Sequence, residues 1–599
     1  MRYVGNEIHS IVTPFSKEDI NFLFAFPDLY EVGMSHLGLH IIYFILNSLE
    51  GVRCERVFHV AEDLEEFIRS GETEFRSLES KTPLKEFDFI GFTLQYEMSY
   101  TTILNMLDLA GLSLRSVDRS EDDPIVLAGG PCSVNPEVLA PFIDLFYLGD
   151  GESQLPELME LKKKYPKRED FLRAAINLEG IYVPSFYRER YEDGVLVCHE
   201  KLLDGAPMPV KRNILQDLDA SFHPEQMIIP FMDTVHDRAV MEIFRGCTQG
   251  CRFCQAGMIY RPVRERRRET NIKHIRNMVR NGGHNEFSLS SLSTLDYSDI
   301  EALVEELQQE YAKDHVNISL PSLRMDSFSL DVLEKVATVR KSSLTFAPEA
   351  GSQRLRDVIN KNVSEEDIFT TFDRVFEIGY QKFKLYFIMG LPTETDEDIL
   401  AISELAKRLK WRYSQVQSLP LTLTISTSVL VPKPFTPFQW MKVLDKDTIH
   451  HRQQLLKRQL NSKGLQYRYH DASTTHVEAV LARGDRRVAD VVEKAFLMGS
   501  KRDSWSQHFS LGRWEEAFLS CGLSMESYLE EIPLNRYLPW MIIDVGVTQQ
   551  YLKHEYKKAL QGEKTPDCRE GCLYCGIQNT RAGGHCFDGA ITTSKVQLP

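Results

Sequence analysis

The chain has 599 residues, 43% of them hydrophobic and 26% charged, and a formal net charge of −16. One hydrophobic core cannot serve this length, so roughly three or four domains are expected. The acidic balance argues against a surface that coats nucleic acid, and no apolar run reaches the roughly 20 residues that a membrane-spanning helix requires. The start of the chain has no apolar segment typical of a signal peptide, and seven of the eleven cysteines fall in two tight groups. We therefore expect a cytoplasmic protein that uses its cysteines for metal binding rather than for disulfides.

The first 165 residues alternate between short apolar runs and helical patterns. Strands are expected over 21–26, 87–93, 125–128 and 145–148, with helices over 35–48 and 99–110. Such alternation is typical of a doubly wound, Rossmann-like sheet, which binds ligands where its strands end. Glycines occupy these ends, namely Gly33, Gly38, Gly129, Gly130, Gly149 and Gly151.

A second series of βα units begins near residue 235, after a proline-broken, β-rich connection. Its expected strands are 239–244, 286–292, 316–323, 343–349, 382–389 and 421–431. Helical patterns separate them over 298–315, 330–340, 352–361, 365–379 and 395–412. Six strands rather than eight suggest an incomplete barrel, with its chemistry at the C-terminal strand ends.

The sequence therefore predicts an α/β protein in four parts. These are a Rossmann-like domain (1–165), a β-rich connecting region (166–234), a partial (β/α)6 TIM barrel (235–450) and a mostly helical C-terminal extension (451–599).

The first cysteine group directly follows the first barrel strand. Cys247, Cys251 and Cys254 have the spacing C-x₃-C-x₂-C. Three thiolates on one loop can hold three irons of a cubane cluster and leave the fourth iron open to a chelating ligand. Phe253, between two of the ligands, is expected to shield the cluster from water.

The second group has the spacing C-x₃-C-x₂-C-x₁₀-C and lies near the end of the chain. Cys568, Cys572, Cys575 and Cys586 supply four thiolates within nineteen residues. With all four bound the site is closed, and either an auxiliary iron–sulfur cluster or a structural zinc fits it.

The first motif and its place after a barrel strand resemble the radical SAM enzymes. The resemblance implies that the open iron binds S-adenosylmethionine (SAM) and that an electron from an oxygen-sensitive [4Fe–4S] cluster cleaves SAM. Methionine and a 5′-deoxyadenosyl radical result, and the radical abstracts hydrogen from a substrate. A flavodoxin- or ferredoxin-type protein is the implied electron donor.

The same resemblance suggests SAM contacts at the ends of later strands. Ser288 and Ser290 would lie near the methionine amino group, and Arg324 would pair with the methionine carboxylate. Glu349 would bind ribose hydroxyls beside Gly351 and Ser352. Gly390, Pro392 and Glu394 resemble the family's G-x-P-x-E turn beside the adenine.

The N-terminal domain resembles cobalamin-binding domains that precede the barrel in one radical SAM class. Its turn Asp28-x-Tyr30-x-x-Gly33 has tyrosine where a histidine would ligate cobalt, so base-off binding of cobalamin is the mode left open. A Rossmann-like domain that holds no corrin is the alternative. Over nearly its whole length the chain resembles a bacterial radical SAM family with this domain and a Cys-rich C-terminal extension, often accompanied by a separately encoded partner domain.

Three functional hypotheses remain open at this point. The first is methyl transfer through cobalamin. The second is a cobalamin-free, methylthiotransferase-like modification of RNA or protein, in which the arginine-rich segment 261–268 binds phosphate and Cys54, Cys132 and Cys198 hold a second cluster. The alternative interpretation of the arginine-rich segment is a solvated face of a helix. The third hypothesis is a non-catalytic iron–sulfur protein.

Overall fold

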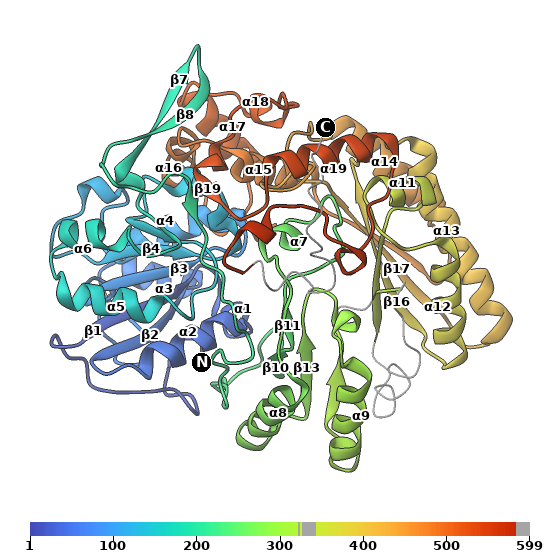
Figure 1. Cartoon of the computed structure of the whole chain (residues 1–599), viewed down its shortest axis with the longest axis horizontal. Helices are drawn as coiled ribbons and strands as arrows, with labels where there is room; N and C mark the ends of the chain where they lie inside the picture. Colours follow the sequence, from blue (N-terminus) through green and yellow to red (C-terminus); the bar gives the residue numbers. More distant parts are fainter. Residues whose placement is uncertain (322–323, 326–342, 583–599) are drawn as a thin grey trace.

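The computed structural model describes residues 1–321, 324–325 and 343–582. Its N-terminal part is built on a six-stranded sheet with the order β2-β1-β3-β4-β5-β6 (Figure 1). The first five strands are parallel, and β6 pairs antiparallel with β5. The strands are β1 (Ile20–Phe26), β2 (Val52–Phe58), β3 (Phe89–Thr93), β4 (Ile125–Gly129), β5 (Leu145–Tyr147) and β6 (Ile181–Tyr182).

Helices cover both faces of this sheet. Helix α2 packs beside α5, and α3 packs beside α4. The connection through α2 runs from β1 to β2, whereas those through α3 and α4 run in the opposite direction, to β3 and β4. Right-handed crossovers therefore place α2 on one face and α3 and α4 on the other. The helices are α1 (Tyr30–Gly33), α2 (Leu37–Asn47), α3 (Glu62–Arg69), α4 (Tyr100–Leu109), α5 (Leu155–Lys164) and α6 (Arg168–Ala175).

Strand β2 lies within this sheet although the sequence patterns do not predict it. Its segment carries charged residues, and the Arg56 side chain is completely buried between Glu7 (2.8 Å) and Glu79 (2.6 Å). Buried charges are retained only when they are paired, and these partners lie far away in the sequence. Patterns within this segment alone therefore do not indicate a strand.

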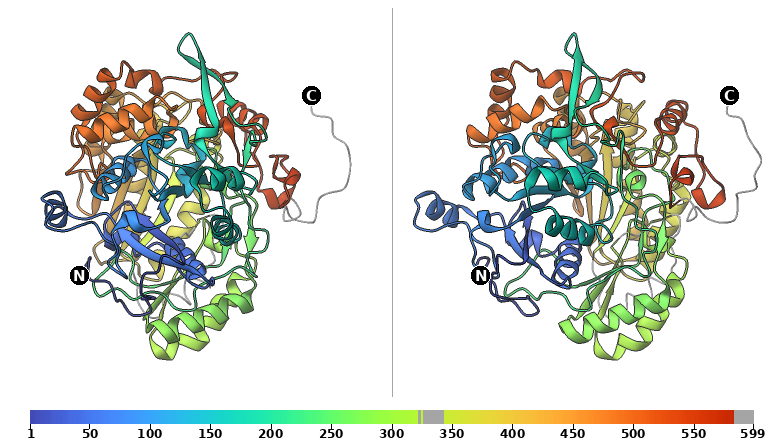
Figure 2. Two further views of the ribbon diagram at one scale, coloured as in Figure 1. Left: turned by 90° about the vertical axis from the view of Figure 1, so that its left-hand side faces the viewer. Right: turned by 60° about the vertical axis from the view of Figure 1, so that its left-hand side comes forward.

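Residues 183–234, which follow β6, contain three strands. Strands β7 (Tyr187–Glu192) and β8 (Val195–Lys201) form an antiparallel hairpin that projects from the body of the molecule (Figure 2). Strand β9 (Val210–Lys211) pairs with β19 (Ile543–Asp544) of the C-terminal region.

The barrel part contains two parallel sheets, β10-β13-β14 and β15-β16-β17-β18. Its strands are β10 (Ala239–Glu242), β13 (Glu286–Ser290), β14 (Asn317–Ser319), β15 (Leu344–Glu349), β16 (Lys382–Met389), β17 (Thr422–Val429) and β18 (Leu465–Tyr469). The short pair β11 (Phe244–Arg245) and β12 (Arg264–Glu265) flanks helix α7 (Ala256–Ile259). Helices α8 (Arg268–Gly282), α9 (Ile300–Tyr311), α11 (Gln353–Val358), α12 (Glu365–Glu377), α13 (Asp396–Val416) and α14 (Lys446–Gln459) complete the units.

The α/β fold class and the six predicted barrel strands are thus confirmed, with one addition. Strand β18 extends the parallel sheet beyond residue 450, in a region expected to be helical. The helix expected over 330–340 lies outside the described residues.

The remaining C-terminal region is mostly helical and docks on both other parts. It comprises α15 (Ala472–Arg483), α16 (Val488–Leu497), α17 (Leu511–Ser520), α18 (Met525–Leu529) and α19 (Gln549–Gln561). The indole N–H of Trp505 donates to Asp28 (2.9 Å), and Arg486 donates to Glu137 (2.8 Å). These hydrogen bonds hold the C-terminal region against the N-terminal part. Among the described residues, no helix combines the length and apolarity needed to cross a membrane.

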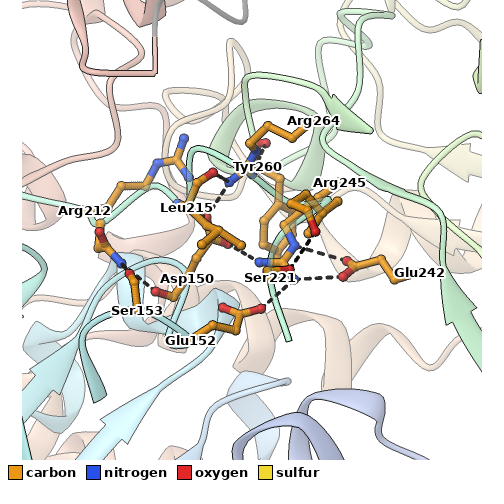
Figure 3. A network of polar contacts seen from close by, with 12 residues as sticks. Asp150, Glu152, Ser153, Arg212, Leu215, Ser221, Glu242, Arg245, Tyr260 and Arg264 are labelled. Atoms are coloured by element: carbon orange, nitrogen blue, oxygen red, sulfur yellow. Dashed lines mark hydrogen bonds and ion pairs between the residues drawn. The ribbon is translucent and has the colours of Figure 1, made fainter. Parts of the chain in front are cut away.

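A buried ion network joins the N-terminal sheet to the barrel (Figure 3). Arg245, at the end of β11, donates to Asp150 (2.6 Å) and Glu152 (2.8 Å) after β5, and also to Glu242 (2.8 Å). Arg264 donates to the other oxygen of Asp150 (2.5 Å). Burial alone would raise the pKa of Asp150, but the neighbouring arginines lower this pKa well below its usual range. The ion pairs therefore stabilise the fold above the pKa of the unfolded carboxyl, and this contribution is lost as pH falls through the lower folded pKa.

Replacing Asp150 by asparagine should destabilise the protein. Removing one partner of a buried ion pair typically costs about 3–5 kcal/mol, because the remaining charges stay buried. We expect a lower thermal midpoint for Asp150→Asn, measured by circular dichroism. The matched control is Glu160→Gln, whose carboxylate is 66% exposed. Equal midpoints for the two variants would show that the network does not hold the parts together.

Candidate active site

The cysteines of the first motif lie on residues 246–254, which we call the cysteine loop. A turn closed by the N–H of Cys254 and the carbonyl of Cys251 (3.1 Å) brings the three thiols within electrostatic reach of one another. Gly246 has φ of +95°, and a Cβ at this residue would lie 2.5 Å from the carbonyl oxygen of Pro262. The loop can therefore pack here only with glycine.

The loop is held from behind by segments that are distant in sequence. The side-chain amide of Asn360 donates to the carbonyls of Gln249 (3.4 Å) and Gly250 (3.3 Å). The guanidinium of Arg252 is fully buried and donates to Glu555 on α19 (3.0 Å). Backbone direction in the loop is thus fixed before any ligand binds.

The chemistry of the loop fits an iron–sulfur cluster. Burial and the neighbouring Cys251 raise the pKa of Cys247 to about 11 and that of Cys254 to about 12. Thiols lose their protons when a metal binds them, so a metal would compensate this unfavourable burial of charge. Arg324 lies near enough to act on Cys247, and Lys361 on Cys254. Three thiols on one loop, with cations nearby, suit an anionic cluster.

Two residues predicted to contact SAM lie together near this loop. Glu349 ends β15 and has φ of +67°, a strained conformation that is enriched at functional sites. Lys361, which the sequence patterns do not single out, lies 3.5 Å from the Glu349 carboxylate. Burial raises the pKa of Glu349, while Lys361 and Arg324 partly offset this effect. Arg324 and Glu349 are therefore close to each other as well as to the cysteine loop.

The serines and the phenylalanine predicted near SAM have different surroundings. Ser288 is buried within β13, whereas Ser290 at its end lines the cavity described below. Phe253 is half-buried and packs on the hydrophobic core beside the loop.

The other predicted SAM contacts have packing roles within the barrel. Ser352 caps α11 and donates to Asp398 (2.5 Å). A Cβ on Gly351 would lie 2.3 Å from the backbone nitrogen of Ile402. Glu394 accepts from the N–H of Gly390 (2.7 Å) and pairs with Arg452, and Pro392 between them is buried. Contact of these residues with SAM stays a prediction.

A cavity of about 450 Å³ lies between the N-terminal sheet and the cysteine loop. The strand order 2-1-3-4-5 puts a topological switch point between β1 and β3, where such sheets bind ligands. On the sheet side the lining includes Phe24, Thr93, Gln95, Tyr147 and the predicted glycines Gly38, Gly129, Gly130, Gly149 and Gly151. On the barrel side it includes Phe244, Arg245, Gly246, Tyr260, Ser290 and Ser291.

Three residues in or near the turn that follows β1, namely Tyr30, Gly33 and His36, have different surroundings. Gly33 does not line the cavity, because it packs against the ring of Phe58, and a Cβ on this glycine would lie 2.3 Å from that ring. Tyr30, which stands where histidine would ligate cobalt, donates to Glu7 (2.9 Å) in the buried network of Arg56. His36 lines the cavity instead, and burial lowers its pKa to about 4.

Both interpretations of the arginine-rich segment 261–268 are wrong for three of its five arginines. Arg261, Arg264 and Arg266 are at most 4% exposed. Arg264 pairs with Asp150, and Arg266 donates to the carbonyl of Ser221 (3.1 Å). These guanidinium groups bind the protein's own carboxylates and carbonyls, so they form neither a solvated face nor a phosphate-binding rim.

The remaining cysteines separate into two sets. Cys54 lies in β2 and Cys132 follows β4. Because β1 and β3 lie between these two strands, the two cysteines are at least about 14 Å apart. This separation contradicts a cluster shared with Cys198, which lies in the projecting hairpin. In contrast, Cys568, Cys572 and Cys575 lie together beside the cysteine loop. Cys586 lies outside the described residues.

Comparison with known families agrees with this arrangement. A family model described as the radical SAM superfamily matches residues 241–406, and one described as the N-terminal part of radical SAM proteins matches residues 38–184. The chain belongs to the radical SAM superfamily, whose enzymes use a [4Fe–4S] cluster and SAM.

Individual relatives extend the match over most of the chain. An uncharacterized protein of Methanocaldococcus jannaschii is 28% identical over 506 residues, which are 83% of this chain and 97% of that protein. An uncharacterized methyltransferase of Pyrococcus horikoshii is 24% identical over 54% of this chain and 72% of its own length. Among solved structures, the radical SAM methyltransferase TsrM of Kitasatospora setae, with cobalamin and a [4Fe–4S] cluster bound, has a TM-score of 0.46 at 13% identity, covering 70% of this chain and 77% of that one.

Replacing Lys361 by methionine should weaken SAM binding without loss of the cluster. Without Lys361 the pKa of the buried Glu349 would rise, and a protonated carboxyl would accept a hydrogen bond from a ribose hydroxyl less well. We expect the Kd for SAM to increase roughly tenfold, which corresponds to about 1.4 kcal/mol. Equilibrium dialysis with SAM and an iron assay would measure both properties. Lys382→Met, at an exposed position of β16, is the control. Unchanged SAM affinity in Lys361→Met would remove Glu349 and Lys361 from the SAM site.

Proposed function

We propose that this radical SAM enzyme transfers a methyl group by means of cobalamin held in the cavity between the N-terminal sheet and the cysteine loop. The lining of this cavity is the main support for the proposal. A single cavity is lined by the strand-end loops of the Rossmann-like domain and by Gly246, the residue next to the cluster ligand Cys247. A cofactor in this cavity would face the site where SAM is cleaved.

The lining has the chemical character that a corrin requires. Phe22, Phe24, Phe92 and Leu127 provide an apolar wall, while Thr93 and Gln95 offer polar groups for amide side chains of the ring edge. Pockets of this kind, mostly apolar with a few placed polar groups, are typical of cofactor sites. Cobalamin, when bound, would supply a carrier for the methyl group.

The state of His36 favours a corrin without a histidine ligand. The Nδ1 atom of His36 accepts from the N–H of Leu39 (3.2 Å), because this residue caps α2. With Nδ1 as acceptor and a pKa of about 4, the neutral ring carries its proton on Nε2. A ring nitrogen that carries a proton cannot ligate a metal. Together with the distant Tyr30, this supports base-off binding without a ligand from the first turn.

The protein's own residues prepare the site. The cluster, when bound to the three cysteines, supplies the electron that cleaves SAM. Arg252 and Asn360 fix the loop that orients the cluster, and Arg324 and Glu349 are positioned to orient SAM. Arg245 closes the side of the cavity by pairing with Asp150 and with two further carboxylates, which keeps this wall rigid and limits entry of water. A flavodoxin- or ferredoxin-type donor and a separately encoded partner domain remain part of the proposal.

The methyl group as the transferred unit has further support. The Pyrococcus horikoshii relative is an uncharacterized methyltransferase. The alternative, a methylthiotransferase-like reaction on RNA or protein, loses two of its supports in this structure. Cys54 and Cys132 are separated by two strands, and three of the five arginines that would bind phosphate, Arg261, Arg264 and Arg266, are buried.

Replacing Cys251 by alanine should abolish formation of 5′-deoxyadenosine. Two thiolates cannot hold the cluster at the open geometry that SAM requires. The measurement is mass spectrometry of the products after reduction with SAM present. Cys521→Ala, at the end of α17 and far from both cysteine groups in the sequence, is the control. Deoxyadenosine at the wild-type level in Cys251→Ala would contradict the cluster assignment.

Filling the cavity should prevent corrin binding and leave SAM cleavage intact. Gly129 tolerates a side chain, since its φ is not positive and the nearest atom to a Cβ is the Tyr147 oxygen at 3.4 Å. We expect Gly129→Leu to bind hydroxocobalamin at least about tenfold more weakly in an absorption titration, a loss of about 1.4 kcal/mol. The control is Gly512→Leu, where a Cβ meets no atom within 4 Å. Wild-type affinity in Gly129→Leu would place the corrin elsewhere, and no binding to the wild type would refute the proposal.

A further inference from the structure

The second cysteine group lies directly against the cysteine loop. The N–H of Cys568 donates to the carbonyl of Thr248 (3.3 Å), and the hydroxyl of Thr248 donates to Asp567 (2.9 Å). Thr248 is the neighbour of the cluster ligand Cys247, so the two motifs are joined through adjacent residues. Figure 1 shows the C-terminal coil crossing the molecule beside α7.

This contact limits the separation of the two groups. The hydrogen bond from Cys568 to Thr248, together with standard backbone dimensions, puts the Cα atoms of Cys247 and Cys568 at most about 11 Å apart. The two motifs therefore belong to one region of the protein, although more than half of the chain separates them in sequence.

The three described cysteines of the second group lie near one another. Cys568 lies near enough to Cys572 and Cys575 for their charges to act on it. Cys575 is buried, and its carbonyl accepts from the N–H of Thr548 (2.8 Å) at the start of α19. Tyr574, between two of the cysteines, has φ of +50°, so the turn that gathers the sulfurs is a constrained one.

A buried arginine between the two groups points to an anionic ligand. Arg261 is 4% exposed and donates through Nε to the carbonyl of Gly257 (2.9 Å). Its Nη2 atom is buried and has no hydrogen-bond partner among the described residues. The same atom lies 3.7 Å from the Cβ position of Gly250 on the cysteine loop, and Cys575 lies near the guanidinium. The other terminal nitrogen, Nη1, donates to the hydroxyl of Tyr551 (3.5 Å), a neutral partner. A cation left partly unpaired in the interior is costly unless a negative group completes its surroundings.

We propose that Cys568, Cys572 and Cys575 bind a second iron–sulfur cluster, with Arg261 between it and the first. Thiolate-ligated clusters carry negative charge, which the buried guanidinium would balance. Iron rather than zinc is favoured because the spacing C-x₃-C-x₂-C repeats that of the first group and because a buried cation lies beside the second group. The inference goes beyond the proposed function and does not depend on cobalamin.

The experiment compares metal content and spectra of wild type, Cys572→Ala, Cys251→Ala and the control Cys521→Ala, all purified and reconstituted without oxygen. We expect each of the first two variants to keep roughly half of the wild-type iron and sulfide, since each loses one cubane cluster. Cys521→Ala should keep all of it. In the reduced wild type, the two clusters should broaden each other's electron paramagnetic resonance signals, and either single variant should show a sharp, unperturbed signal.

Several outcomes would overturn the proposal. These are zinc in place of iron at the second group, unchanged iron in Cys572→Ala, or no iron left in Cys251→Ala. Because Cys251→Ala keeps the second group intact, the proposal can still be tested if Cys572→Ala fails to fold. None of these results concerns corrin binding, so failure here and failure of the methyl-transfer proposal are distinguishable.

Discussion

The ion pairs of Arg245 hold together the two parts of the protein on which the site depends. Arg245 ends β11 and precedes the cysteine loop, and its partners Asp150 and Glu152 follow β5 of the N-terminal sheet. A buried guanidinium that binds carboxylates from both sides fixes distance and orientation more strictly than apolar contact does. The strand ends of one domain are therefore aligned with the cluster loop of the other.

This alignment creates the cavity and explains its mixed lining. Neither domain alone would enclose the space between β1, β3 and the cysteine loop. The C-terminal region reinforces the arrangement by contacting both parts, through Trp505 and Asp28 on one side and Arg252 and Glu555 on the other. A site in which two cofactors face each other would depend on these contacts among all three parts of the protein.

Much of the fold could be predicted because the sequence patterns that indicate its strands and helices are local. Alternating apolar runs and helical patterns indicate most strands of the N-terminal sheet and the six expected strands of the barrel. The spacing of Cys247, Cys251 and Cys254 indicates the metal loop. Strand β2 escapes such patterns because the charge of Arg56 is neutralised by Glu7 and Glu79, which lie far from it in the sequence.

The site was less predictable, because its residues acquire their roles through long-range contacts. Lys361 and Asn360 follow a short helix without any motif, yet they meet Glu349 and the cysteine loop. Ser352, which the sequence predicts as a SAM contact, also caps α11 and donates to Asp398, a role that depends on a residue far away in the sequence. The arginines of 261–268 have an exposed-looking pattern, and only the fold shows that their partners are Asp150 and backbone carbonyls.

The most direct test of the account is the corrin content of protein purified without oxygen from cells supplied with cobalamin. Absorption spectroscopy and mass spectrometry would identify and quantify the bound corrin in the same sample in which deoxyadenosine formation is followed. We expect stoichiometric corrin, with a spectrum that lacks a histidine ligand to cobalt, together with deoxyadenosine. Deoxyadenosine without bound corrin would rule out methyl transfer through cobalamin and leave the N-terminal domain as a scaffold.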